Sequence, residues 1–128
     1  MTVRVVRLGD DRFPGEGLRI GTVRRPPRGV PKSDYSSRNF YDVWLPALAP
    51  SAGTVKLAQK ARTEGEWRKF IKRYRAEMAT PENRATLDLL AALSRHADFS
   101  VGCYCADESR CHRSVLRALL QERGAQMI

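Results

Sequence analysis

The chain lacks any apolar run long enough to cross a membrane, and residues 1–4 do not open a secretory signal peptide. Cysteine is scarce, with three residues among 128, and the odd number favours reduced thiols over a disulfide framework. Internal repeats and low-complexity tracts are also missing. We therefore predict a cytoplasmic protein without a membrane partner, built as one domain over residues 1–128.

Acidic residues are few relative to basic ones. Asp and Glu number 14 against 23 Lys and Arg, which gives a formal net charge of +9. Such an excess favours polyanionic partners, either nucleic acid or phosphorylated small molecules. The chain has no basic segment interleaved with aromatic residues that would mark a known nucleic-acid motif. The net charge is therefore the only feature that supports nucleic-acid binding. The alternative is a basic protein whose arginines are simply solvated.

Apolar patterning divides the chain into short strands and amphipathic helices. Apolar runs predict strands at residues 2–8, 18–23 and 99–105. Capping signals at Ser51, Thr63 and Thr80 predict three helix starts, and Gly124 ends a last helix. An apolar strand at 99–105 with both faces covered indicates a central strand of a parallel or mixed sheet. We predict an α/β domain with a small, mainly parallel β-sheet flanked by α-helices.

The segment from Phe99 to Ser114 holds all three cysteines and one of the two histidines. It begins as a strand, passes through a short acidic and polar loop, and resumes as a helix. Open α/β folds place ligand sites at this kind of strand-to-helix turn. The start of the helix also offers free N–H groups and a partial positive charge, which suit an anion or a thiolate. We therefore predict the functional site here.

Three residues are candidates for catalysis. Cys111 lies at the first turn of the last helix beside cationic residues, which favours its thiolate. Helical spacing places His112 in line with residues that face the sheet, where it can act as a base or hydrogen-bond partner. Asp42 lies in an aromatic stretch and can orient a histidine or accept from an arginine.

Candidate ligand-binding residues flank these three. Arg24 belongs to an arginine cluster at the end of the second predicted strand, and Arg113 follows the Cys-His pair. Both are predicted anion contacts, and Cys103 and Tyr41 complete the set. The predicted function is binding of a phosphate-bearing ligand, either a nucleotide or nucleic acid, with thiol-dependent catalysis as a possible addition. A non-catalytic nucleic-acid or protein-interaction module stays open as the alternative.

Two other interpretations concern the sulfurs themselves. Cys103, Cys105, Cys111 and His112 together make a Cys₃His set acceptable to zinc. Adjacent residues on a helix diverge by about 100°, which disfavours joint ligation by Cys111 and His112. A Cys/His zinc-binding protein therefore stays open as an alternative, and no metal or other cofactor is assigned. For Cys105 alone, the favoured interpretation is a small buried sulfur in a packed strand.

The same residues carry a family resemblance. The motifs are residues 102–108 and 111–114, with residues 41–46 and 48–51 and the pair Trp67 and Phe70. The chain resembles the DUF488 family of uncharacterised domains. The resemblance implies a cytosolic α/β domain of bacteria or archaea and names no activity. It also implies that the family's first cysteine and its later Cys-His-Arg motif correspond to Cys103, Cys111, His112 and Arg113.

A weaker likeness connects Cys105 and Arg110, which have the Cys-x₄-Arg spacing of rhodanese and phosphatase loops. In this chain the intervening Asp107 and Glu108 would repel an oxyanion, and the loop has no glycine. The spacing is therefore an analogy only.

Overall fold

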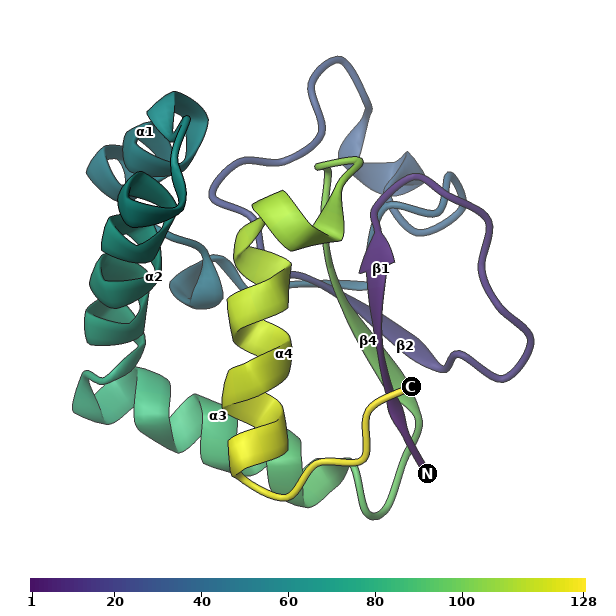
Figure 1. Ribbon diagram of the computed structural model, residues 1–128. Coiled ribbons are helices and arrows are strands. Elements are labelled where there is room, and N and C mark those ends of the chain that lie inside the picture. Colours follow the sequence, from purple (N-terminus) through teal and green to yellow (C-terminus); the bar gives the residue numbers. More distant parts are fainter.

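A computed structural model describes residues 1–128, with four strands and four α-helices (Figure 1). The strands are β1 (Val3–Arg7), β2 (Leu18–Gly21), β3 (Val43–Trp44) and β4 (Phe99–Cys103). The helices are α1 (Ala52–Lys60), α2 (Glu64–Met78), α3 (Pro81–Leu93) and α4 (His112–Glu122). No helix is both long enough and apolar enough to span a membrane.

The four strands form one all-parallel sheet in the order β1-β4-β2-β3. Arg7 pairs with Cys103 and Gly21 pairs with Gly102, so β1, β4 and β2 end at the same edge. Every residue of the central strand β4 is buried. The predicted α/β domain with a mainly parallel sheet is confirmed. Strand β3 was not predicted, because two residues carry no recognisable pattern.

The helices begin at the three predicted caps. The side chains of Ser51, Thr63 and Thr80 each accept a hydrogen bond from the backbone three residues on. Gly124 takes a φ of 86° after α4, a left-handed conformation that favours glycine. Because these signals are local in the sequence, they correctly predicted where the helices start and where the last one stops.

The main core lies between the helices and one face of the sheet. It joins Val3, Phe99 and Val101 of the strands to apolar side chains of α2, α3 and α4. Phe70 and Tyr74 of α2 are almost fully buried in this core. This packing holds the N-terminal end of α4 over the C-terminal edge of the sheet (Figure 1).

A buried ion pair ties β2 to the loop between β1 and β2. Arg19 is 0% exposed, and its guanidinium donates to both carboxylate oxygens of Glu16, at 2.7 and 2.9 Å. Ser100 of β4 donates to the same carboxylate. Burial raises the pKa of Glu16, but the hydrogen bonds from Arg19 and Ser100 outweigh it and hold the pKa below its usual value. No pattern in the sequence predicted this pair.

Candidate functional site

A pocket of about 300 Å³ opens at the C-terminal edge of the sheet. Its walls come from the segment after β2, from the residues before and within α1, from α2, and from the β4–α4 connection. The lining residues are Val23, Arg24, Arg25, Ala49, Pro50, Val55, Ala58, Gln59, Phe70, Cys103, Tyr104, Cys105, Arg110, Cys111 and His112. The volume is at the lower end of the range for small-molecule sites. The thiol-rich segment therefore faces a pocket large enough for a ligand.

All three cysteines line this pocket, and they differ in exposure. Cys103 and Cys111 are buried, whereas Cys105 is exposed. The interpretation of Cys105 as a buried strand sulfur is therefore wrong. The reason is that β4 ends at Cys103, so Cys105 belongs to the loop that follows the strand.

The three thiols differ in the direction of their pKa shifts. Cys103 Sγ donates to Cys105 Sγ across 3.7 Å. The hydrogen bonds from Cys103 and Cys111, helped by the nearby Arg113 charge, lower the pKa of Cys105 to about 3. The same contact raises the pKa of Cys103. The pKa of Cys111 is lowered by its contacts with Cys103 and His112, against an opposing contact with Cys105 and burial. The cluster thus favours a thiolate on its exposed member.

The ring of His112 is fixed by the end of β2. His112 Nε2 lies 2.8 Å from the carbonyl oxygen of Thr22, which can only accept, so Nε2 carries the ring hydrogen. Nδ1 is then an acceptor, and it lies 3.7 Å from Cys111 Sγ. Tyr74 packs edge-on against the ring. As predicted from helical spacing, His112 faces inward, toward the sheet.

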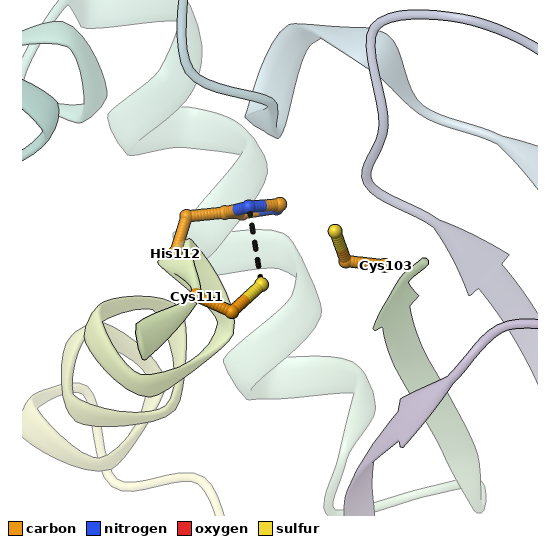
Figure 2. Close-up of side chains that lie close together, drawn as sticks. All are labelled: Cys103, Cys111 and His112. Atoms are coloured by element: carbon orange, nitrogen blue, oxygen red, sulfur yellow. Dashed lines mark hydrogen bonds between the residues drawn. The ribbon is translucent and has the colours of Figure 1, made fainter. Parts of the chain in front are cut away.

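Cys111 and His112 converge instead of diverging. Cys111 is the N-cap of α4 and has extended backbone angles (φ −129°, ψ 155°), so the helical spacing of 100° does not apply to this pair. Figure 2 shows both side chains turned toward Cys103 at the end of β4. The donor atoms of Cys103, Cys111 and His112 all lie within 4.8 Å of one another. These three residues could hold a metal ion.

The arginines that line the pocket differ in whether they form ion pairs with acidic residues. Arg24 and Arg25 are exposed on the lining, and neither is in an ion pair. Arg110 pairs with Glu64 at 2.9 Å and lies over the ring of Trp67. The pocket therefore presents two cationic groups with no acidic partner.

Arg113 is not on the lining. It is buried, and its Nη2 donates to the carbonyl oxygen of Cys105 at 2.6 Å, while its Nε has no partner. The charge predicted to contact a ligand thus lies beneath the loop that carries Cys105.

The structure does not bring Asp42 or Tyr41 to the pocket lining. Asp42 accepts two hydrogen bonds from Arg12 and one from the backbone of Arg19, so it does not orient His112. Burial raises the pKa of Asp42, but these bonds and one from a serine hydroxyl leave it lowered. Tyr41 is buried against Gly21, where a Cβ would come within 2.4 Å of the ring. Asp42 thus supports the start of β2 and Tyr41 its end. Cys105 and Arg25, in contrast, are pocket residues that were not predicted as site residues from the sequence.

The loop between β4 and α4 satisfies its own backbone groups. The amides of Ser109, Arg110 and Cys111 bond to Asp107 and Glu108 within the loop. An oxyanion cradle needs such amides to point at the ligand. The Cys-x₄-Arg spacing therefore does not build a rhodanese-like cradle here.

The fold and the site together define a small α/β protein with a thiol-rich, partly cationic pocket at the edge of a parallel sheet. A family model, DUF488-N3a, described as the active DUF488-N3 subclade, matches residues 3–124. The chain belongs to this family, which confirms the resemblance to DUF488. No curated protein and no solved structure matches the chain.

Proposed function

We propose that the chain is a thiol-dependent enzyme that acts on a phosphate-bearing ligand bound in this pocket. One observation carries the proposal. The same pocket is lined by an exposed thiol, that of Cys105, and by the guanidinium groups of Arg24 and Arg25, which form no ion pairs. Membership in a subclade described as active supports catalysis over simple binding.

The pocket offers two kinds of wall to a ligand. Arg24 and Arg25 supply positive charge on the lining, and arginine binds phosphate oxygens through paired N–H groups. Other lining residues are apolar, with Val55, Ala58 and Phe70 among them. A ligand with a phosphate at one end and a flat or apolar group at the other fits both walls, and a nucleotide has this chemistry.

Cys105 is the nucleophile in this proposal. Its sulfur attacks an electrophilic atom of the bound ligand and forms a covalent bond, while the leaving group departs with the bonding electron pair and takes a proton from water. Water then releases the enzyme-bound part and regenerates the thiol. The guanidinium of Arg113 beneath the loop favours the thiolate before the attack. Cys111, the nucleophile predicted from the sequence, is only 2% exposed, and in this proposal it supports the Cys105 thiolate as a hydrogen-bond donor.

Replacing Arg24 and Arg25 by serine is expected to weaken binding of AMP and pyrophosphate by at least about tenfold. A hydrogen bond to a charged group contributes about 1.5–3 kcal/mol, and about 1.4 kcal/mol corresponds to a factor of ten. Isothermal titration calorimetry of wild type and the double variant measures the change.

The matched control is Arg68→Ser, which removes an exposed arginine of α2 outside the pocket. Equal losses in the control and the double variant would contradict a built anion site. The non-catalytic nucleic-acid module would instead be favoured if the affinity for oligonucleotides falls steeply with salt and is unchanged in Cys105→Ser, with no Cys105-dependent turnover.

A further inference from the structure

We infer that Cys103, Cys111 and His112 form a binding site for a soft divalent cation, and that Zn²⁺ suits it best. The three donor atoms lie within 4.8 Å of one another and come from the end of β4 and the start of α4 (Figure 2). Thiolate and imidazole are the ligands that zinc prefers, whereas magnesium and calcium take oxygen.

The distance between Cys111 Sγ and His112 Nδ1 suits a tetrahedral ion. Bonds of about 2.3 Å to sulfur and about 2.0 Å to nitrogen separate a sulfur and a nitrogen ligand of a tetrahedral ion by about 3.5 Å. The distance from Cys111 Sγ to His112 Nδ1 is 3.7 Å. All three donor atoms lie within 4.8 Å of one another, so side-chain rotation alone can bring them to an ion, while the strand and the helix that carry them stay packed in the core.

His112 is already oriented as a metal ligand. Its Nε2–H is donated to the carbonyl oxygen of Thr22, which leaves the lone pair of Nδ1 on the side of Cys111. Ligating histidines nearly always donate their second ring N–H to a carbonyl or carboxylate in this way. This arrangement fixes the tautomer before an ion arrives.

The fourth coordination position faces the pocket, since all three donors are on its lining. Structural zinc sites close all four positions with protein ligands, whereas catalytic sites keep one for water or substrate. Cys105 Sγ contacts Cys103 Sγ but is outside the group of three donors. When the ion binds, Cys103 and Cys111 release their thiol protons to solvent and Cys105 remains the free thiol of the pocket. The inference does not rest on the proposed function. With the ion bound, the thiol hydrogen bonds to Cys105 are lost, and the charge of Arg113 still favours its thiolate.

The test measures Zn²⁺ binding by competition with a chromophoric chelator, using untagged full-length protein first stripped of metal. We expect one equivalent to bind, and Co²⁺ in its place to give the sulfur-to-metal absorption of thiolate ligation. The variants Cys111→Ser and His112→Gln should each lose at least about a hundredfold in affinity, more than the loss of an outer partner usually costs. Cys105→Ser is the matched control and should bind as wild type does.

A second measurement needs no variant and so does not depend on how the variants fold. Alkylation followed by mass spectrometry should show that Zn²⁺ protects Cys103 and Cys111 and leaves Cys105 reactive. The inference is overturned if the wild type binds no Zn²⁺, or if binding survives both Cys111→Ser and His112→Gln. It is also overturned if Cys105→Ser loses binding or Zn²⁺ protects Cys105, because Cys105 would then close the site.

Discussion

Iodoacetamide is expected to alkylate Cys105 at about pH 5 within a few fold of its rate at about pH 8, in protein stripped of metal. Only the thiolate reacts, and an ordinary thiol with a pKa near 8.5 loses about a thousandfold in thiolate over this interval. Hydrogen bonds from Cys103 and Cys111 and the charge of Arg113 lower the pKa of Cys105 to about 3. Its thiolate therefore persists throughout the interval.

The measurement is peptide mapping of alkylated Cys105 at short times across pH, with glutathione as the unperturbed reference thiol. The variant Arg113→Gln removes one of the favourable charges, so the pH at which reactivity falls should move upward. The buried Cys103 and Cys111 serve as internal controls and should react far more slowly. A profile for Cys105 that follows glutathione would contradict the stabilised thiolate.

Replacing Arg19 by methionine is expected to lower the free energy of unfolding by about 3–5 kcal/mol, because it leaves the buried Glu16 carboxylate without its counter-ion. The guanidinium also donates to the backbone carbonyls of Asp10 and Asn39, so its loss releases two loops as well as one ion pair. Urea denaturation followed by circular dichroism measures the difference.

The control for this prediction is Arg75→Met, which breaks an exposed pair with Glu122 and should cost at most about 1 kcal/mol. The pH dependence gives a further check. The folded-state pKa of Glu16 is lowered, so its contribution to stability is fully present above the unfolded-state pKa of about 4.3 and is lost as the pH falls through the folded value. If Arg19→Met lowers the free energy of unfolding no more than Arg75→Met does, the variant does not leave a costly unpaired carboxylate in the core, and the prediction is wrong.

Much of the fold could be predicted because its signals are local. A cap such as Thr63 or Thr80 needs only the next three residues, so a short stretch of sequence is enough to predict each helix start. The mainly parallel sheet was predicted from the apolar run at 99–105, of which the structure keeps Phe99–Cys103 as the fully buried strand β4. Strand β3 was missed because its two residues are paired only through contacts with β2.

The site could be located but not fully assigned from sequence. Its position at the β4–α4 turn follows from topology, and His112 does face inward. The roles of Cys105 and Cys111 depend on where β4 ends and on the extended backbone of an N-cap residue, and neither can be read from spacing. Of the two arginines predicted to contact an anion, Arg24 lies on the pocket lining, whereas Arg113 is buried and is not on the lining. Spacing in the sequence does not distinguish them.

The roles of Arg19 and Asp42 depend on contacts between distant segments. Arg19 is held by a loop before it in sequence and by Asn39 after it, and Asp42 pairs with Arg12 thirty residues away. No local pattern distinguishes such residues from solvated charges. For this reason a buried structural arginine went unpredicted while a structural aspartate was selected as a candidate for the site.

The central claim is that one pocket presents a reactive thiol together with cationic groups for an anion. It is tested most directly by the ratio of the iodoacetate to the iodoacetamide alkylation rate at Cys105, because the two reagents differ mainly in charge. The account predicts a ratio several-fold above that of glutathione, which falls toward the glutathione value in the Arg24→Ser, Arg25→Ser variant and at high salt. A ratio equal to that of glutathione in the wild type, unchanged by the two substitutions, would contradict it.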